Sequence, residues 1–261
     1  MIILLHSSKS MKANPPGAKQ YQSPQLLEHA KKLNEFLKTL SPAQIQKSMK
    51  VSAPLAQKTK DLIADWNIDP TKQTPAIDAF RGDIYSGLQA HTLSAKERSY
   101  ANKTLYILSG LYGVLRALDG IHPYRLEMAY KFDKKPFSNM YDFWADAIAQ
   151  CLPKTGPIIN LAADEYSKTV TKFVEKSRIV APKFMTINSK TREPKFVVVH
   201  AKIARGTFAN WLVTSQQTDP EKFKTFKEIG YQYSKDLSSE EIPTFVCKEF
   251  KGTGLSVKLL P

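Results

Sequence analysis

Short stretches of strand character alternate with segments that carry helix start signals along the 261 residues of the chain. Apolar runs and apolar–polar alternation predict strands at Met1–Leu5, Leu105–Leu108, Pro123–Phe132, Pro157–Leu161, Phe196–His200 and Pro243–Phe250. Capping serines and apolar periodicity predict helices from Ser23, Ser41, Ser52 and Ser94, over Ser138–Leu152, from Asp164 and over Ala201–Val213. Because strands and helices alternate without a long linker, we expect one compact α/β domain (mixed α+β) over residues 1–261, with an extra helical layer near the N-terminus.

The charge balance limits the partners of the chain. Lys and Arg number 38 against 24 Asp and Glu, which leaves a net charge of +14. A field of this sign attracts DNA, RNA, phosphorylated metabolites or anionic lipids, although a solvated basic surface without a specific partner gives the same count. The apolar runs fall far short of the roughly 20 residues that span a bilayer. The first run ends at His6–Lys9 without the form of a secretory signal, so we expect a cytoplasmic protein without a membrane partner.

Two polar segments are candidates for ligand binding. Lys9 lies in the loop after the first predicted strand, and ligands of open α/β sheets bind beyond strand ends. This lysine is a candidate to grip a phosphate or, with a lowered pKa, to act as a nucleophile; the alternative is an ordinary surface lysine. In the segment Phe80–Leu88, Arg81 is a candidate anion ligand that Asp83 orients, and the alternative is a turn with an internal ion pair. The loop around Lys9 has no glycine, which excludes a P-loop.

A glycine-rich turn follows the strand predicted at Leu105–Leu108. Gly110, Tyr112 and Gly113 precede Arg116, and we predict that the turn leads into a short helix. Free backbone N–H groups in such a turn, together with the helix dipole, hold a DNA phosphate without reading the base sequence. The turn partly resembles the hairpin of helix-hairpin-helix DNA-binding modules. The alternative is a tight strand-to-helix turn with Tyr112 packed inward.

Charged residues also lie close together in the second half of the chain. Arg125 and Glu127 share one side of a predicted strand, where they either face a ligand or pair with each other. Asp164 and Glu165 begin a predicted helix, where they are candidates for a general base or a metal ligand, and where the helix dipole alone explains two acids.

A further pair of cations lies on a predicted helix, and several motifs of known active sites are missing from the sequence. Lys202 and Arg205 are three apart on a predicted helix face and form a second candidate phosphate-binding pair. The histidines are scattered, and Cys151 and Cys247 are the only cysteines, which predicts neither a zinc site nor a disulfide framework. The sequence also lacks a nucleophile elbow and a dinucleotide-binding fingerprint. We therefore predict no metal and no cofactor.

Taken together and in order, these motifs resemble the YaaA family of bacterial peroxide-stress-response proteins. The blocks that carry the resemblance are Phe80–Leu88, Leu108–Arg116, Pro123–Met128, Ile159–Tyr166 and Ala201–Gly206. The resemblance implies an unusual α/β fold with a positively charged cleft, a helix-hairpin-helix-like element that binds duplex DNA, and a role in limiting oxidative DNA damage. One position departs from the family pattern: Lys12 stands where the family's N-terminal loop usually has Asp, whereas Lys9 is retained.

These observations give a leading hypothesis and two alternatives. The leading hypothesis is a DNA-binding protein of the peroxide response whose partner is double-stranded DNA, with no protein partner predicted. The residues predicted to contact DNA are Lys9, Arg81, Gly110, Tyr112, Gly113, Arg116, Arg125, Lys202 and Arg205. The first alternative is an enzyme that modifies nucleotides or nucleobases around Lys9, Arg81 and Asp83, with Asp164 and Glu165 as further catalytic candidates. The second alternative, iron or haem handling, has no ligand cluster in the sequence to support it.

Overall fold

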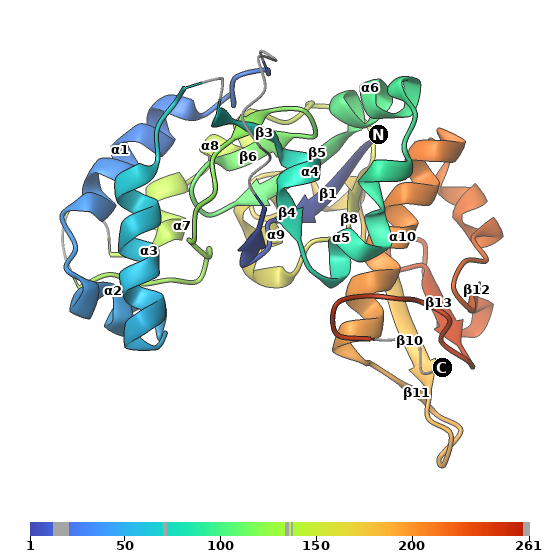
Figure 1. Ribbon diagram of the computed structural model, residues 1–261. Helices are drawn as coiled ribbons and strands as arrows, with labels where there is room; N and C mark the ends of the chain where they lie inside the picture. The colour runs from blue at the N-terminus through green and yellow to red at the C-terminus, as the bar shows by residue number, and fades with distance from the viewer. Residues whose placement is uncertain (13–20, 70–71, 134–135, 137, 258–261) are drawn as a thin grey trace.

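A five-stranded sheet forms the centre of the molecule (Figure 1). The computed structural model describes residues 1–12, 21–69, 72–133, 136 and 138–257. The sheet has the order β6-β5-β1-β8-β9, with the bounds β1 Ile2–His6, β5 Leu105–Ser109, β6 Gly113–Arg116, β8 Ile158–Asn160 and β9 Ile179–Val180. β1 is parallel to β5 and β8, and β9 is parallel to β8. β1 and β5 are buried along their whole length, which explains why both appear in the sequence as nearly unbroken apolar runs.

The glycine-rich turn joins two strands rather than a strand and a helix. β6 is antiparallel to β5, with Ser109 opposite Gly113. The short helix predicted at Arg116 is therefore wrong, and this segment forms a β-hairpin instead of a hairpin between helices. The reason is that Val114 and Leu115 are fully buried in the sheet, while Gly113 adopts φ +69°, a conformation that suits a tight turn.

Three helices form an N-terminal arm on one side of the sheet (Figure 1). They are α1 Leu27–Lys38, α2 Pro42–Met49 and α3 Ala53–Asp65. The start of α2 predicted at Ser41 is confirmed, because the Ser41 hydroxyl accepts from the Gln44 N–H and the Gln44 side chain accepts from the Ser41 N–H. The helix start predicted at Ser23 is wrong: its carbonyl accepts a hydrogen bond from the Arg116 guanidinium, and α1 begins only at Leu27.

Other helical predictions are confirmed in part. The capping box predicted at Ser94 begins α6 Ala95–Thr104. The single helix predicted over Ser138–Leu152 is divided into α7 Met140–Trp144 and α8 Ala147–Gln150, because Ala145 between them adopts φ +43° and interrupts the helical path. The helix predicted from Asp164 is α9 Asp164–Thr171 and directly follows β8.

The strand predicted over Pro123–Phe132 does not form. Its backbone instead lies against the glycine-rich turn: a Cβ placed on Gly110 would lie 2.2 Å from the Leu126 carbonyl oxygen. Near the end of the predicted range, Lys131 forms an isolated β-bridge with Asn139. The segment is an irregular connection that contains a turn and passes the carboxyl end of β5.

A second sheet and the longest of the described helices form the C-terminal arm. This sheet has the order β11-β10-β13-β12, with the bounds β10 Lys183–Ile187, β11 Pro194–Lys195, β12 Tyr231–Tyr233 and β13 Thr244–Cys247. The strand predicted over Pro243–Phe250 is confirmed in its first half as β13. The strand predicted over Phe196–His200 is wrong, because Val198–His200 begins α10 Val198–Ser215. A short apolar run fits a strand and a buried helix equally well, and here tertiary packing selects the helix.

Two glycines allow α10 to cross α5 Asp83–Leu88 at very short distance. A Cβ on Gly206 would lie 1.8 Å from the Ile84 carbonyl oxygen, and a Cβ on Gly87 would lie 2.1 Å from the Ile203 carbonyl oxygen. Short elements complete the described chain: β2 Ser10–Met11 paired with β4 Phe80–Arg81, β3 Thr74–Pro75 paired with β7 Gly120–Ile121, α4 Ala76–Ala79, and the 3-10 helices η2 Ala90–Thr92, η3 Lys176–Arg178, η4 Pro220–Thr225 and η5 Lys235–Leu237. The α5–α10 crossing positions both helices beside the end of β1.

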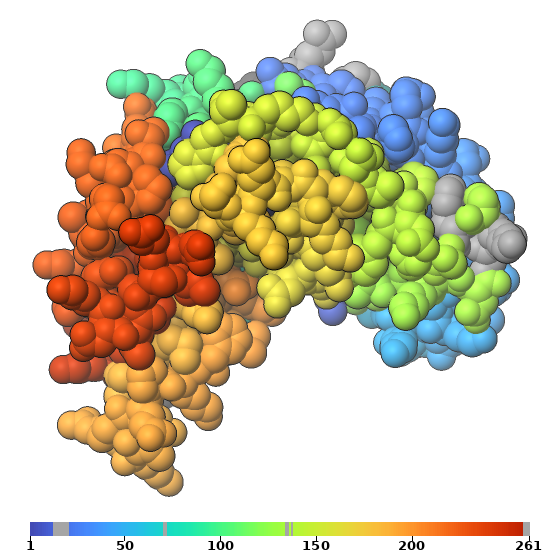
Figure 2. Space-filling model, turned by 180° about the vertical axis from the view of Figure 1, so that it is seen from behind, coloured from blue at the N-terminus to red at the C-terminus, as the bar shows by residue number. Residues whose placement is uncertain are grey.

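The two arms give the molecule the outline of an arch. Figure 1 shows α1, α2 and α3 on one side of the central sheet, and α10 with the second sheet on the other. Figure 2 shows, from behind, that the underside is hollowed between the β10–β11 hairpin and the N-terminal helices. β1 points toward this underside, so its carboxyl end faces the hollow. None of the described helices has the length and apolar character needed to cross a membrane.

Candidate functional site

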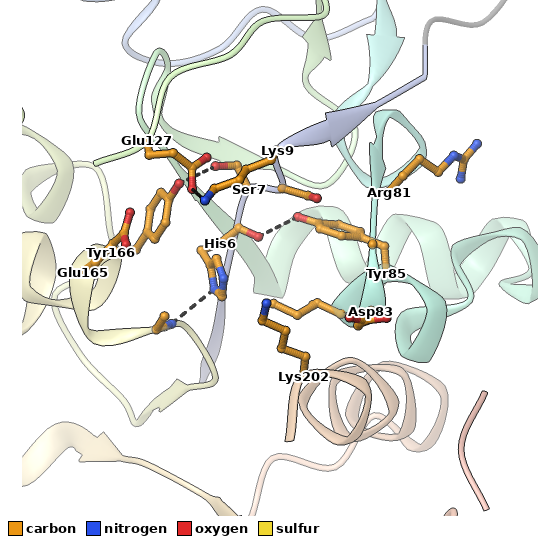
Figure 3. A pocket seen from close by; sticks show the side chains of 14 residues that line it. His6, Ser7, Lys9, Arg81, Asp83, Tyr85, Glu127, Glu165, Tyr166 and Lys202 are labelled. Atoms are coloured by element: carbon orange, nitrogen blue, oxygen red, sulfur yellow. Dashed lines mark hydrogen bonds and ion pairs between the residues drawn. The ribbon is translucent and has the colours of Figure 1, made fainter. Parts of the chain in front are cut away.

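A cavity of about 310 Å³ opens where β1 ends (Figure 3). The loop after β1, the β4–α5 turn, the start of α9 and one face of α10 supply most of its lining. The lining residues are His6, Ser7, Ser8, Lys9, Arg81, Gly82, Asp83, Ile84, Tyr85, Glu127, Ala163, Glu165, Tyr166 and Lys202. This is the edge of the sheet at which parallel strands present their carboxyl ends. Five of the candidate site residues meet here, namely Lys9, Arg81, Asp83, Glu165 and Lys202.

His6 is the last residue of β1 and forms one wall of the cavity. Its Nδ1 accepts a hydrogen bond from the Ala163 N–H at 3.2 Å, so the neutral ring carries its proton on Nε2. Burial, helped by the nearby charges of Arg205 and Lys202, lowers the pKa of His6 to about 3. The ring therefore stays neutral at physiological pH and presents an N–H donor.

Two carboxylates lie on the side of His6 away from Lys202 (Figure 3). The Glu127 side chain is 13% exposed, and its Oε2 lies 3.9 Å from the Lys9 ammonium. Burial raises the pKa of Glu127, while the Lys9 charge opposes that shift. Among the described residues, Glu165 Oε1 is buried and has no hydrogen-bond partner. A ligand group with N–H donors would therefore be stabilised between these two carboxylates.

Helix α10 brings two cations to the opposite side. The Lys202 side chain extends toward His6 in Figure 3. Arg205 is half-buried beside the cavity, close enough to His6 to affect its pKa. Burial lowers the pKa of Arg205, and the Asp164 carboxylate opposes that shift. Arg205 and Asp164 thus flank the cavity without lining it, and Asp164 is exposed at the start of α9.

Arg81 and Asp83 point in different directions. The Arg81 side chain is exposed, and its guanidinium points away from Lys9 and the centre of the cavity (Figure 3). Both Asp83 carboxylate oxygens accept hydrogen bonds from Ser256, one from the N–H and one from the hydroxyl, each at 3.0 Å. The C-terminal segment therefore holds Asp83 at the rim of the cavity.

A second cavity of about 300 Å³ adjoins the first, and Lys9 lines both. Arg125 lines this second cavity, together with the α3 residues Leu55, Lys58, Thr59 and Leu62. The Arg125 guanidinium donates to the Lys9 carbonyl oxygen at 3.5 Å. Lys12, at the position where the family usually has Asp, is exposed and lies outside both linings, and its N–H donates to Ala79 O.

The residues of the glycine-rich turn lie in the core rather than in the cavity. Tyr112 is 1% exposed, and its hydroxyl accepts a hydrogen bond from Trp66 Nε1 at 2.7 Å. The Tyr112 N–H donates to Ser109 Oγ at 3.0 Å. Gly110 approaches the Leu126 carbonyl, and a Cβ on Gly113 would lie 2.8 Å from Trp144. Close packing therefore accounts for both glycines. The inward-facing Tyr112 agrees with the alternative interpretation of this segment as a tight turn with Tyr112 packed inward.

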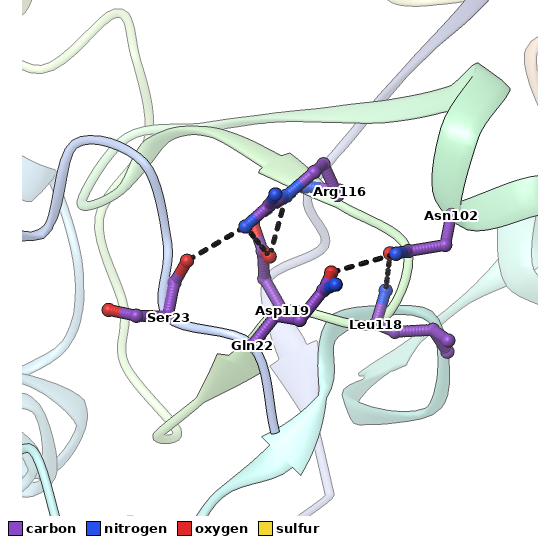
Figure 4. Close-up of polar contacts among 6 residues, drawn as sticks. All are labelled: Gln22, Ser23, Asn102, Arg116, Leu118 and Asp119. Carbon is purple, nitrogen blue, oxygen red and sulfur yellow. Dashed lines mark hydrogen bonds and ion pairs between the residues drawn. The ribbon is translucent and has the colours of Figure 1, made fainter. Parts of the chain in front are cut away.

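Arg116 lies at the opposite edge of the sheet from the cavity. It pairs with Tyr106 near the start of β5, whereas the cavity lies at strand ends. Its Nε donates to Asp119 Oδ1 and its N–H to Asp119 Oδ2, each at 2.9 Å, and its guanidinium also reaches the Ser23 carbonyl (Figure 4). The Asp119 side chain is 0% exposed. Burial raises the pKa of Asp119 to about 6, and the bonds from Arg116 oppose that shift.

Sequence reasoning missed three residues that shape the cavity. His6, Tyr85 and Tyr166 all line it: the Tyr85 hydroxyl donates to the His6 carbonyl at 2.9 Å, and the Tyr166 ring stacks on His6. A polar residue at the last position of a buried strand was the available signal for His6. The described residues contain no group of three or more His, Cys, Asp or Glu side chains arranged to hold a metal ion.

The fold and the site define a mixed α+β protein with a cavity of cations and carboxylates at the carboxyl edge of its parallel strands. The family described as peroxide stress protein YaaA matches residues 1–237. A UPF0246 protein of Salinispora tropica is 53% identical over 258 residues, which cover 99% of this chain and 98% of the relative. A UPF0246 protein of Ralstonia nicotianae is 40% identical over 250 residues, which cover 92% and 96%.

The chain therefore belongs to the peroxide stress protein YaaA family. This confirms the family resemblance inferred from the ordered motifs, and family membership supports a role in peroxide stress.

Proposed function

We propose that this protein binds double-stranded DNA during peroxide stress, with the hollow underside of the arch as the contact surface. The observation that carries the proposal is the gathering of basic side chains from distant segments. Lys9, Lys58, Arg125 and Lys202 come from the β1 loop, α3, the connection after β7 and α10, and all line the two adjoining cavities. A net charge of +14 adds a long-range attraction for a polyanion.

The position of the hollow and the kind of contact support this proposal. The arms that flank the hollow are separate elements, α3 on one side and the C-terminal sheet on the other (Figures 1 and 2). Lysines and arginines on such a surface contact phosphates, which fixes the position of the duplex but does not read its sequence. Arg81, exposed at the rim, extends the same basic surface. We therefore infer binding with little sequence preference.

Titration of a labelled duplex at several salt concentrations tests the proposal. We expect the logarithm of the association constant to fall by about 0.9 per phosphate contact for each log unit of salt. Two unrelated duplex sequences of equal length should bind with similar affinity. Absence of binding at low salt, or an affinity that does not change with salt, would contradict the proposal.

The carboxylates in the first cavity favour a second candidate function, an enzyme that acts on nucleotides or nucleobases. A surface that only contacts phosphates gains nothing from Glu127 and Glu165, because both repel a phosphate. Beside Lys9, and with the neutral His6 as a hydrogen-bond donor, these carboxylates are candidates for proton transfer. The Lys9→Met variant separates the two functions. A binding protein loses a small part of its duplex affinity, whereas an enzyme loses protection against peroxide in cells while duplex affinity is retained.

A further inference from the structure

We propose that the cavity at the end of β1 binds a guanine nucleotide, with the phosphate beside His6 and Lys202 and the base edge between Glu127 and Glu165. The inference rests on the second candidate function, because it names the ligand of that same site. It is carried by the separation of donors and acceptors across one cavity (Figure 3).

The donor side suits an anionic group. His6 is 9% exposed, and its Nδ1 is occupied by the Ala163 N–H, which leaves Nε2–H as the donor on the cavity wall. The Lys202 side chain extends toward the same ring. Arg205 adds a second positive charge near His6, outside the cavity lining. A phosphate in this place would meet one neutral donor and the Lys202 cation, which is the charge-assisted pattern of phosphate binding.

The acceptor side requires hydrogen-bond donors from the ligand. An ionised carboxylate accepts hydrogen bonds and donates none. Glu165 Oε1 is buried without a hydrogen-bond partner among the described residues, so a hydrogen bond from a ligand would satisfy this oxygen. Lys9 offsets one of the two negative charges by its position 3.9 Å from Glu127 Oε2. Two acceptors side by side therefore favour a group with adjacent N–H donors.

Guanine is the nucleobase whose Watson–Crick edge has such a pair, N1–H beside the N2 amino group. Adenine and cytosine each offer one amino group beside an acceptor nitrogen, which would face a carboxylate. A cavity of about 310 Å³ lies within the size range of small-ligand sites, and it is far too small for a duplex. The nucleotide is therefore either free or the terminal residue of a DNA strand.

Isothermal titration of the full chain with GMP tests the proposal, with IMP, AMP and ribose 5-phosphate as matched ligands. IMP lacks the N2 amino group of GMP, so we expect it to bind about tenfold more weakly, and AMP and ribose 5-phosphate more weakly still. This comparison changes the ligand alone, so it does not depend on the folding of a variant. Equal affinity for GMP and ribose 5-phosphate, or no saturable binding of GMP, would overturn the proposal.

Two variants test which side of the cavity binds the base and which binds the phosphate. Glu165→Gln should weaken GMP by about tenfold and leave ribose 5-phosphate unchanged, whereas Lys202→Met should weaken both. Lys96→Met, an exposed position on α6, is the matched control and should change neither. If Glu165→Gln weakens both ligands equally, the assigned orientation is wrong and the proposal fails.

Further titrations separate this site from the other proposals. A thymidine oligonucleotide with a 5′-phosphorylated terminal deoxyguanosine should compete with GMP if the terminal residue of a strand is the source, and should not compete if the free nucleotide is. Saturable GMP binding together with a protein that does not bind duplex would contradict the DNA proposal alone. Duplex binding without GMP binding would contradict the nucleotide site alone.

Discussion

Arg116 and Asp119 form an ion pair whose partners differ in burial. Asp119 is inaccessible to solvent, and the Arg116 side chain is 27% exposed. Removing the cation would leave an unpaired carboxylate in the core, which is one of the more costly changes to a folded protein. The hydrogen bond from Arg116 to the Ser23 carbonyl also holds the chain segment that leads into α1.

We expect Arg116→Met to lower the free energy of unfolding by about 3 kcal/mol, because Asp119 then stays buried without its cationic partner, although the backbone N–H of residue 116 still donates to it. Urea unfolding followed by circular dichroism measures this change. Duplex affinity under native conditions should stay within about twofold of the original, since Arg116 lies at the sheet edge away from the cavities. A stable variant with weak duplex binding would instead make Arg116 a DNA ligand.

His6 makes stability depend on pH in a defined range. Its pKa is about 3 in the folded chain against an ordinary value of 6.5, so the unfolded chain binds the extra proton between these values. Stability from the neutral ring is complete above pH 6.5 and decreases as the pH falls toward 3. Between pH 7 and pH 5 we expect a loss of about 2 kcal/mol from this residue.

Urea unfolding at pH 7 and pH 5 checks this expectation against the His6→Asn variant, whose side chain can still accept from the Ala163 N–H. The variant should show a smaller loss between the two pH values. An equal loss in both proteins would mean that other groups cause the pH dependence.

The sequence pointed to candidate residues next to predicted strand ends, and it gave no signal for side chains that turn inward. Lys9 follows the buried strand β1 and lines the cavity, and position after a buried strand is a local property of the sequence. Lys202 lines the same cavity for another reason, because the strand predicted before it is the start of α10. Tyr166 was not found, because an aromatic residue in a helix has the pattern of a core residue. The distance between Lys9 and Glu127 depends on the folded path of more than one segment, so no local pattern contains it.

At the scale of elements, the crossing of α5 and α10 depends on glycine at a very close backbone contact. Gly206→Ala would place a Cβ 1.8 Å from a backbone carbonyl, which neither helix can accommodate without moving. We expect this variant to lose about 3 kcal/mol of stability. Thr214→Ala, at an exposed position on the same helix, is the control and should lose less than about 0.5 kcal/mol.

Because α5 carries Asp83 and α10 carries Lys202, separation of the helices should also widen the cavity. Thermal unfolding measures the loss of stability, and titration with GMP measures the change in the site. A Gly206→Ala variant as stable as the original chain would show that the helices can shift apart freely.

The capping boxes predicted helix starts correctly, whereas the start signal at Ser23 and the elements defined by distant partners were predicted wrongly. The capping boxes at Ser41 and Ser94 join residues of the same helical turn, so the sequence contains the complete signal. The strand character of β6 depends on its pairing with β5, and the helical character of Val198–His200 depends on α10 as a whole. The spacing of apolar residues within such a short segment contains no information about these distant contacts.

At the scale of the whole molecule, the location of charge should matter more than its total. Lys58→Glu on α3 and Lys96→Glu on α6 change the net charge equally, and both side chains are exposed. Lys58 lines the cavity that borders the hollow, whereas α6 lies at the top of the arch in Figure 1. At physiological salt, charges act over about 8 Å. We therefore expect Lys58→Glu to weaken duplex binding about tenfold and Lys96→Glu by less than about threefold.

Fluorescence anisotropy with one labelled duplex at fixed salt gives both affinities. Equal losses for the two variants would show that the net charge of the molecule, and not the hollow underside, attracts DNA.

The central position of β1 has a consequence for synthesis on the ribosome. Among the strands of this sheet β1 is synthesised first, yet its neighbours begin at Leu105 and Ile158. At about 5 to 20 residues per second, the nascent chain carries this apolar strand without its second neighbour for on the order of ten seconds. A chain released before Ile158 would expose one edge of β1 to aggregation.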